Sequence, residues 1–370
     1  MKKKGHLEPI KRAFVGLSGG VDSAVSAALL KEQGYDVTGV FIKVWQPDWI
    51  ECTWKEDRRD AMRVAAHLNI PFVTLDLVKE YKQGVIDYML SEYEAGRTPN
   101  PDVMCNREVK FGAFWRWAEK NGADFIATGH YARNEKAGDS HFKMLAGVDL
   151  NKDQSYFLWT LNQRDLKHVL FPVGGMIKPK VRELARRFKL PNSSKKDSQG
   201  LCFIGKIDVQ EFLKHYIKTK EGDVIDSNGK VIGKHPGALL FTIGQRYGFS
   251  IQEKSPNDPA YFVVSKDIVK NTITVSGKDS GERLPGGGKT VRLKSVNWVS
   301  GIRPAATDSK GNYLLQGRSR YRQPLQSLRI VSAENNEAVI EFKEKQDTLT
   351  EGQSLVIYDG EECLGGGVIS

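Results

Sequence analysis

The chain is 370 residues long, which is enough for two or three domains, and its 40% hydrophobic and 27% charged residues are typical of a globular protein. No apolar stretch approaches the roughly 18 residues that a membrane span needs, and the first residues carry no apolar signal core, so we expect a cytoplasmic protein with no membrane partner. The net charge of +10 favours nucleic acid as a partner, although charge alone does not separate that partner from a merely basic surface.

The first predicted strand, at residues 13–15, leads into a glycine-rich octet, Gly16–Ser23, with the sequence Gly-Leu-Ser-Gly-Gly-Val-Asp-Ser. An apolar helix follows the octet, so backbone N–H groups and the helix N-terminus can bind a phosphate group. The octet lacks the Lys-Ser/Thr pair of a Walker loop and the glycine spacing of a dinucleotide fingerprint. Asp22 would repel phosphate unless a bound cation or the amides of the loop hold its carboxylate.

Strands and helices then alternate along the first third of the chain. Apolar runs and helical spacing predict strands at 37–42, 71–76 and 124–130 and helices at 57–68, 79–94 and 109–121. Repeated β–α units predict a doubly wound parallel sheet, whose ligands lie at the carboxyl ends of the strands. The octet and the segment 128–130 both lie at that edge, so they can share one nucleotide.

The pattern changes after residue 163. A short basic helix is expected at 181–188 and a polar loop at 195–200. Beyond residue 225, turn signals multiply between short alternating strands such as 272–275 and 338–342, which predicts one or two small β-barrels. We therefore expect an α/β nucleotide-binding domain at 1–165, a small central linker domain at 166–228 and a C-terminal domain of the β-barrel type at 229–370.

Two of the four cysteines lie in polar surroundings. Asp102 stands three residues before Cys105, so within a helical turn the carboxylate and the thiol would face the same way, and a helix start followed by cations would favour the thiolate. Cys202 lies between glycines and after two lysines, and the sequence leaves open whether it is a reactive thiolate or an ordinary strand residue. Cys52 and Cys363 are interpreted as packing residues or bystanders, and no cysteine or histidine has metal-ligand spacing.

Several motifs of the chain recur in the same order in one protein family. These motifs are the octet and the segments 96–106, 127–131, 151–157, 196–205, 244–246 and 363–367. They run over nearly the whole chain, which resembles the bacterial tRNA-specific 2-thiouridylases of the ATP-pyrophosphatase (PP-loop) superfamily. The resemblance implies a Rossmann-like PP-loop domain and a sulfurtransferase that uses ATP, with Mg²⁺ expected beside the nucleotide. It also implies tRNA of the Lys, Glu or Gln type as substrate, thiolated at C2 of the wobble uridine, and a persulfide-donating relay protein or cysteine desulfurase as partner.

The resemblance assigns roles by position. Asp102 would be the acid/base, Cys105 the nucleophile and Cys202 the persulfide carrier, and the two cysteines would end a turnover as a disulfide. The residues implied to contact ATP are Gly16, Leu17, Ser18, Gly19, Gly20, Val21, Asp22, Ser23, Ile42 and Gly129. Position 42 departs from the methionine expected there, but it keeps an apolar contact. The residues implied to contact tRNA are Asn100, Pro101, Asp102, His130, Lys152, Asp153, Gln154, Arg320, Tyr321 and Gln353.

Two other interpretations stay open. A PP-loop ligase that adenylates its substrate and then uses an amine nucleophile would share the octet, but it would not need Asp102, Cys105 and Cys202. An RNA-binding protein built on an inactive nucleotide fold would be expected to have lost Ser18, Asp22 or Ser23, and all three are present.

Overall fold

Three β-sheets organise the chain in the computed structural model, which describes residues 10–49, 54–138, 141–197, 208–252, 260–277, 288–305 and 313–370. The first sheet has five strands in the order β3-β2-β1-β4-β7, and all of its pairings are parallel. Its strands are β1 (Arg12–Gly16), β2 (Asp36–Lys43), β3 (Phe72–Asp76), β4 (Phe125–Ala127) and β7 (Val169–Leu170). The predicted doubly wound parallel sheet is therefore confirmed.

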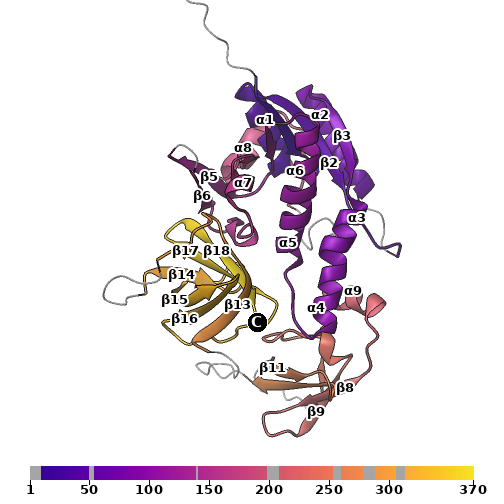
Figure 1. The fold of residues 1–370 in the computed structure, drawn as a ribbon. Helices are drawn as coiled ribbons and strands as arrows, with labels where there is room; N and C mark the ends of the chain where they lie inside the picture. Colours follow the sequence, from indigo (N-terminus) through magenta and orange to yellow (C-terminus); the bar gives the residue numbers. More distant parts are fainter. Residues whose placement is uncertain are drawn as a thin grey trace, which may run out of the picture.

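Helices cover both faces of this sheet, because side chains along β1 alternate between two apolar clusters. Ala13 and Val15 pack with one set of helices, whereas Phe14 packs with the other. The first set comprises α1 (Val21–Glu32), α2 (Trp54–Leu68) and α8 (Lys178–Arg187). The second set comprises two longer helical rods described below (Figure 1).

Each long rod contains a π-helical segment between two α-helical ones. The first rod consists of α3 (Val78–Tyr81), η1 (Lys82–Asp87) and α4 (Tyr88–Glu94), and the second of α5 (Pro101–Met104), η2 (Cys105–Ala113) and α6 (Phe114–Lys120). The two rods approach closely at Gly84, where an added Cβ would lie 2.9 Å from Cβ of Glu108. The first rod confirms the predicted helix at 79–94. The second begins at Pro101 rather than at 109, because Asn100 caps it and proline fits the first helical turn.

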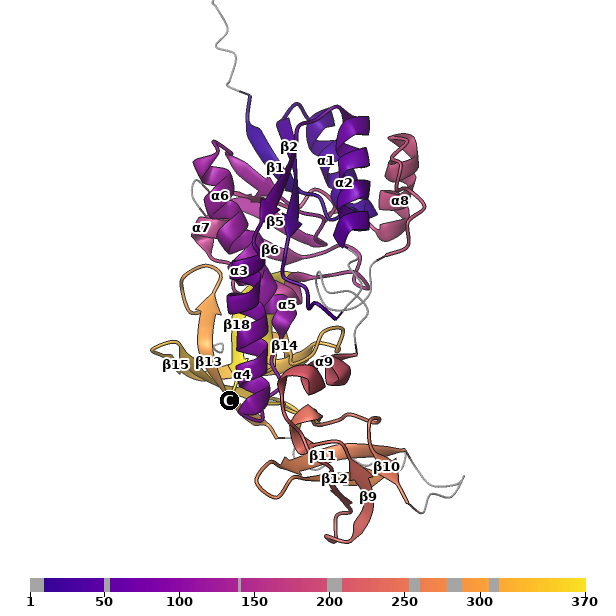
Figure 2. The same cartoon turned by 90° about the vertical axis from the view of Figure 1, so that its right-hand side faces the viewer.

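The second sheet is a small five-stranded unit in the order β10-β9-β8-β12-β11. It lies beyond the end of α4 and next to α9 (Val209–Tyr216), as Figure 2 shows. Its strands are β8 (Gly222–Ile225), β9 (Val231–His235), β10 (Ser250–Ile251), β11 (Tyr261–Asp267) and β12 (Thr272–Gly277), with the short helix η4 (Ala238–Leu240) between β9 and β10.

The third sheet closes into a barrel, because β13 pairs with both β16 and β18. The six barrel strands are β13 (Thr290–Trp298), β14 (Leu315–Arg318), β15 (Gln326–Glu334), β16 (Glu337–Phe342), β17 (Ser354–Asp359) and β18 (Glu362–Ile369). This closure confirms the predicted β-barrel-type C-terminal part. A hairpin from the N-terminal part, β5 (Ala132–Ala137) and β6 (His141–Ala146), extends the barrel sheet beside β18, where Glu362 pairs with Leu145.

A buried ion pair fastens the segment after this hairpin to the barrel. Asp153 is 2% exposed, and one of its oxygens accepts from Arg318 Nη2 on β14 at 2.6 Å. Its other oxygen accepts from the backbone N–H groups of Gly147 and Ser155. The nearby elements are η3 (Ser155–Phe157) and α7 (Gln163–Leu166). Since four hydrogen bonds satisfy the carboxylate, with Ser155 Oγ as the fourth donor, this charge can be buried without being left unpaired.

No helix in the described parts of the chain is long and apolar enough to cross a membrane. One apolar cluster instead runs through all three sheets and includes Phe14 of the parallel sheet, Val263 of the central sheet and Val356 of the barrel. The three sheets therefore share a continuous core.

We expect Arg318→Met to destabilise the protein strongly, because it leaves the buried Asp153 carboxylate without its cation. The free energy of unfolding in a urea titration should fall by about 3–5 kcal/mol. Arg329→Met, which removes the surface partner of Glu341, serves as the control and should stay near the wild-type value. Equal behaviour of the two variants would contradict the structural importance of the buried pair.

Candidate active site

The loop after β1 is held in shape by its own serines. Ser23 Oγ donates to the carbonyl oxygen of Gly20 at 3.1 Å and accepts from the N–H of Ser18 at 3.2 Å. The Ser18 hydroxyl lies 3.2 Å from Ser23 Oγ and accepts from the N–H of Gly20. The loop is therefore preorganised at the N-terminus of α1, where N–H groups and the helix dipole favour an anion.

Two glycines of the site occupy positions that no other residue could take unchanged. Gly19 has a φ of +77°, and a Cβ there would lie 2.5 Å from the carbonyl oxygen of Asp57. Gly129, just after β4, packs on the first turn of α1, and its Cβ would lie 2.6 Å from the N atom of Ser23. The structure thus brings together the two segments that the sequence predicts to share a nucleotide.

A lysine from a distant helix neutralises Asp22. Lys178, the first residue of α8 and 156 positions later, donates to the two carboxylate oxygens of Asp22 at 2.7 and 2.8 Å. Tyr131 donates its hydroxyl to the same carboxylate at 2.8 Å, and burial together with the Asp22 charge raises the pKa of this tyrosine. The sequence leaves open whether a bound cation or the amides of the loop hold the Asp22 carboxylate. In the structure a lysine side chain holds it, and no motif around Lys178 indicates this pairing.

Lys178 is shared with a second carboxylate, that of Asp197. The Lys178 ammonium lies 2.8 Å from Asp197 Oδ1, and Asp197 also accepts from Lys152 at 2.6 Å and from Arg182 at 2.5 Å. Burial opposes ionisation of Asp197, but the hydrogen bonds from Lys152 and Lys178 outweigh it and lower the pKa of this carboxyl group to about 2. This ionic network joins the glycine loop to Lys152, one of the predicted tRNA contacts.

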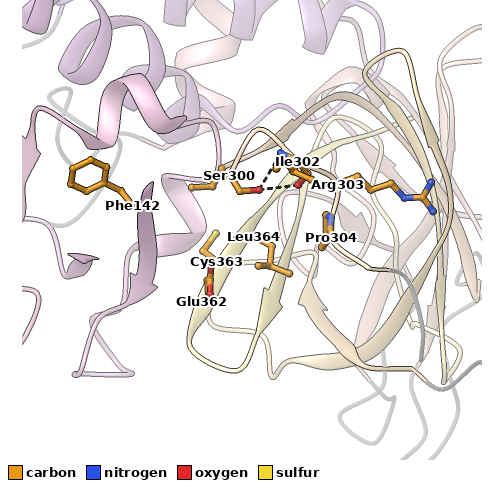
Figure 3. Close-up of a pocket in the computed structure, with 9 residues that line it drawn as sticks. Phe142, Ser300, Ile302, Arg303, Pro304, Glu362, Cys363 and Leu364 are labelled. Atoms are coloured by element: carbon orange, nitrogen blue, oxygen red, sulfur yellow. Dashed lines mark hydrogen bonds between the residues drawn. The ribbon is translucent and has the colours of Figure 1, made fainter. Parts of the chain in front are cut away.

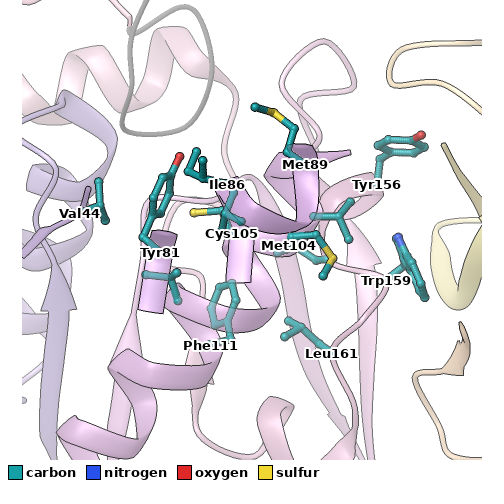
Figure 4. Close-up of a cluster of buried hydrophobic side chains, with 14 of the residues drawn as sticks. Val44, Tyr81, Ile86, Met89, Met104, Cys105, Phe111, Tyr156, Trp159 and Leu161 are labelled. Atoms are coloured by element: carbon teal, nitrogen blue, oxygen red, sulfur yellow. The ribbon is translucent and has the colours of Figure 1, made fainter. Parts of the chain in front are cut away.

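The helix with the predicted nucleophile begins at Pro101, near the end of the segment 96–102. The Asn100 side chain accepts from the N–H of Val103 and caps α5, which places Asp102 in its first turn. Cys105 follows at the start of η2 with 0% exposure, and it points toward Tyr81 and Ile86 in an apolar cluster (Figure 4). The polar sequence neighbours of Cys105 predict polar surroundings for this thiol, but apolar side chains enclose it instead.

His130 lies between the glycine loop and the Cys105 helix. Its Nδ1 is 2.7 Å from Thr128 Oγ1, and its Nε2 is 3.4 Å from the ammonium group of Lys110 on η2. Burial lowers the pKa of His130 well below its ordinary value, and the charge of Lys110 lowers it further. The neutral ring therefore accepts from Lys110 and donates to Thr128.

Several predicted tRNA contacts make contacts within the protein instead. Asp153 is buried, and Gln154 Oε1 accepts from the N–H of Tyr131 at 3.0 Å. Arg320 donates to the carbonyl oxygen of Ile243 at 2.8 Å. The Tyr321 ring lies 4.6 Å from the ring of Phe157, and the Gln353 amide donates to the carbonyl oxygens of Thr98 and Pro99. Their role toward tRNA stays a prediction.

Four further residues named in the sequence analysis comprise two that the structure describes, Ile42 and Cys363, and two that it does not, Cys52 and Cys202. Ile42 is buried on β2 and faces the same apolar cluster as Cys105. Cys202 and Cys52 lie outside the described residues, so the predicted Cys105–Cys202 disulfide stays a prediction. Cys363 is buried on β18, and burial raises the pKa of its thiol, in line with its interpretation as a packing residue.

A small cavity of about 190 Å³ lies at the side of the barrel (Figure 3). It is lined by Phe142, Val299, Ser300, Ile302, Arg303, Pro304, Glu362, Cys363 and Leu364. None of the predicted catalytic, ATP-binding or tRNA-binding residues lines it. We therefore do not assign the candidate chemistry to this cavity.

Family models match nearly the whole chain. A tRNA methyl transferase HUP domain matches residues 11–206, a tRNA methyl transferase PRC-barrel domain matches 210–277, and an aminomethyltransferase beta-barrel domain matches 288–369. The predicted division at 165 and 228 is not tested by these matches and stays a prediction.

Similar proteins match over their full length. The tRNA-specific 2-thiouridylase MnmA of Christiangramia forsetii is 44% identical, with 98% of this chain and 100% of that protein covered. The tRNA-specific 2-thiouridylase MnmA of Thiobacillus denitrificans is 45% identical, with coverages of 97% and 99%. A solved U34-tRNA thiolase, NcsA from Methanococcus maripaludis, is 20% identical with a TM-score of 0.34 over 49% of this chain and 57% of that one, which is too distant to bear on function.

A serine- and glycine-rich loop on the first strand of a doubly wound parallel sheet places the chain in the PP-loop class of ATP-pyrophosphatase folds. Within that class, the chain is similar over nearly its full length to the two proteins named tRNA-specific 2-thiouridylase above. The chain belongs to the tRNA-specific 2-thiouridylase family, and at this level the prediction of a sulfurtransferase is confirmed.

The neutral state of His130 predicts a pH dependence of stability. The unfolded chain protonates this histidine near pH 6.5, whereas the folded protein keeps it neutral to lower pH, so stability is lost as the pH falls below 6.5. A His130→Gln variant lacks this loss. Between pH 7 and 5.5, the wild type should lose about 1 kcal/mol more unfolding free energy than the variant in urea titrations. Identical pH profiles would contradict the buried neutral histidine.

Proposed function

We propose that this protein thiolates C2 of the wobble uridine in tRNA of the Lys, Glu or Gln type, in an ATP-dependent reaction with a cysteine persulfide as sulfur source. The observation that carries the proposal is a continuous path from the glycine loop to the Cys105 helix. Gly129 packs against Ser23, and the next residue, His130, hydrogen-bonds to Lys110 on η2. A site for activating an oxygen thus adjoins a helix with a carboxylate and a thiol.

The residues of the loop fit a nucleoside triphosphate. The N–H groups at the start of α1, the hydroxyl groups of Ser18 and Ser23 and the ammonium group of Lys178 would hold the phosphates. ATP supplies an adenylate that turns the uridine C2 oxygen into a good leaving group, with release of pyrophosphate. Mg²⁺ is expected with the nucleotide, and the described residues contain no group of three metal-ligating side chains that would hold it independently.

The sulfur-transfer steps balance without a further oxidant. The terminal sulfur of a Cys202 persulfide attacks C2, the C2–O bond breaks, and AMP leaves. The Cys105 thiolate then attacks Sγ of Cys202, which releases 2-thiouridine and leaves a Cys105–Cys202 disulfide. Alternatively, Cys105 attacks the persulfide first, and the released sulfide displaces AMP. A reductant must reduce the disulfide before the next turnover.

Cys105 must be accessible in either order of the sulfur-transfer steps. The thiol is enclosed in the state described here, so the segment 96–105 must move before Cys105 meets a base or a persulfide. A wobble base lies in an anticodon loop, so the cost of taking it out of its stack is small. Asp102, in the first turn of α5, would act as acid/base on the bound uridine.

The proposed partners follow from this chemistry. Cys202 would receive its sulfane sulfur from a relay protein or a cysteine desulfurase, and the basic chain would bind tRNA in the cytoplasm, where ATP is also present. Two matching family models are described as tRNA methyl transferase domains. Methyl transfer needs neither a phosphate loop nor a pair of thiols, so the site favours thiolation. An amine-using PP-loop ligase would likewise leave both thiols without a role.

We expect Cys105→Ser and Cys202→Ser each to abolish 2-thiouridine formation when tRNA, ATP and a persulfide donor are supplied. Tandem mass spectrometry of digested tRNA measures the product. Both variants should retain tRNA-dependent ATP–pyrophosphate exchange, because adenylation precedes sulfur transfer. Full thiolation by both variants would contradict the mechanism, and turnover with ammonia in place of persulfide would favour the ligase.

We also expect Lys178→Met to lower tRNA-dependent ATP–pyrophosphate exchange by about 100-fold, because it removes the cation beside the loop. The matched control is Lys180→Met, two residues further along the same helix, where the exposed lysine pairs with Glu183. This control should exchange at the wild-type rate. Equal rates for both variants would show that Lys178 has no part in binding the nucleotide phosphates.

A further inference from the structure

The segment 96–102, which we call the target-base loop, is held by a turn of the C-terminal barrel. The N–H of Thr98 donates to the carbonyl oxygen of Glu351 at 2.9 Å. Gly352 has a φ of +89°, and a Cβ there would lie 2.8 Å from the carbonyl oxygen of Thr98. The backbone of the barrel turn therefore packs directly against the backbone of the loop.

Gln353 adds a side-chain clamp to this contact. Its Nε2 donates to the carbonyl oxygens of Thr98 at 2.8 Å and of Pro99 at 3.1 Å. Two carbonyl acceptors fix the orientation of the amide, because only its NH₂ group can donate to both. Its Oε1 accepts no hydrogen bond from the part of the chain that the structure describes. This oxygen is the group of Gln353 that remains for a donor from outside.

The clamp continues into the capped helix. Pro99 directly precedes Asn100, whose side chain caps α5 and also hydrogen-bonds to the hydroxyl group of Tyr156. That hydroxyl donates to the carbonyl oxygen of Ser354, the residue after Gln353. The start of β17 therefore holds the target-base loop at two successive points, and α5 carries this position to Asp102 and Cys105.

The loop between η4 and β10 contributes to the same junction. Thr98 Oγ1 lies 3.1 Å from Thr242 Oγ1, and Arg320 of the barrel donates to the carbonyl oxygen of Ile243 and to Thr350 Oγ1. All three parts of the molecule thus meet at Thr98, which is 7% exposed. Such a junction can transmit a change in the barrel to the loop, because the contacting groups are directional hydrogen bonds.

We propose that Gln353 is a positioning residue, which sets the target-base loop and through it Asp102 and Cys105 in response to RNA bound on the barrel. The inference rests on the proposed function and deepens it. An RNA hydroxyl or amino group that donates to Oε1 polarises the amide and strengthens its two N–H bonds to the loop. One side chain then senses RNA with its oxygen and holds the loop with its nitrogen.

The test compares Gln353→Glu with a matched control, Gln163→Glu. In the first variant, the new carboxylate would face two carbonyl oxygens and release the loop. Gln163 on α7 makes the same kind of clamp elsewhere between the N-terminal part and the barrel, with Nε2 donating to the carbonyl oxygens of Phe142 and Val299 at 2.9 Å each. Both changes introduce the same charge against two carbonyl groups, so similar losses in Tm are expected.

Three measurements are made on both full-length variants: kcat for thiolation, the Kd for tRNA, and the rate at which iodoacetamide alkylates Cys105, located by peptide mass spectrometry. For Gln353→Glu we expect kcat to fall 10- to 100-fold with Kd within about threefold, and alkylation of Cys105 to rise about tenfold. Gln163→Glu should leave kcat and alkylation at wild-type values.

Other outcomes overturn the proposal. A higher Kd with unchanged kcat would show that Gln353 only contacts RNA. Equal changes in kcat and alkylation in both variants would show that Gln353 only stabilises the contact between the N-terminal part and the barrel. Alkylation of Cys105 at the wild-type rate in Gln353→Glu also overturns it. If the wild type forms no 2-thiouridine, the proposed function fails, but the alkylation measurement still decides whether Gln353 holds the Cys105 helix.

Discussion

The Asp22 carboxylate in the first turn of α1 pairs with a lysine from a distant part of the chain, and the arrangement of the candidate active site depends on this ion pair. Asp22 takes Lys178 from α8, which fixes α8 against α1 on one face of the parallel sheet. Lys178 also pairs with Asp197, which in turn pairs with Lys152 and Arg182. A connected network of ion pairs therefore extends from the glycine loop to the predicted tRNA-binding segment. A polyanionic ligand at the loop would compete with these carboxylates for the same cation, so its binding would redistribute the whole network.

The C-terminal barrel also organises the molecule, through hydrogen bonds to its other two parts. Residues that were predicted to meet tRNA, such as Gln353 and Arg320, make hydrogen bonds between the parts of the molecule. The two roles are compatible, because a side chain with several donors and acceptors can use one group inward and another outward. Under the proposal, contact with RNA and control of the target-base loop become one physical event, which would suit an enzyme that exposes its thiol only to the correct substrate.

The fold was largely predictable from the sequence, because the alternating apolar runs of the parallel sheet and the turn-bounded strands of the barrel carry strong local signals. Asn100-Pro101 is a helix-start signal as well, and using it would have moved the predicted start from 109 to 101. Lys178 could not be found in this way, because its pairing with Asp22 joins residues 156 positions apart. The burial of Asp153 and Cys105 also depends on tertiary packing, which polar neighbours in the sequence do not reveal.

The hairpin β5–β6 and the Asp153–Arg318 pair together have a consequence for synthesis. The ribosome makes the hairpin long before β18, and Asp153 precedes its arginine by 165 residues. During translation the N-terminal part therefore exposes a carboxylate destined for the interior until β14 emerges, and an unpaired strand edge until β18 emerges. Since β18 pairs with β13 of the barrel and with β6 of the hairpin, one strand couples closure of the barrel to completion of the N-terminal hairpin.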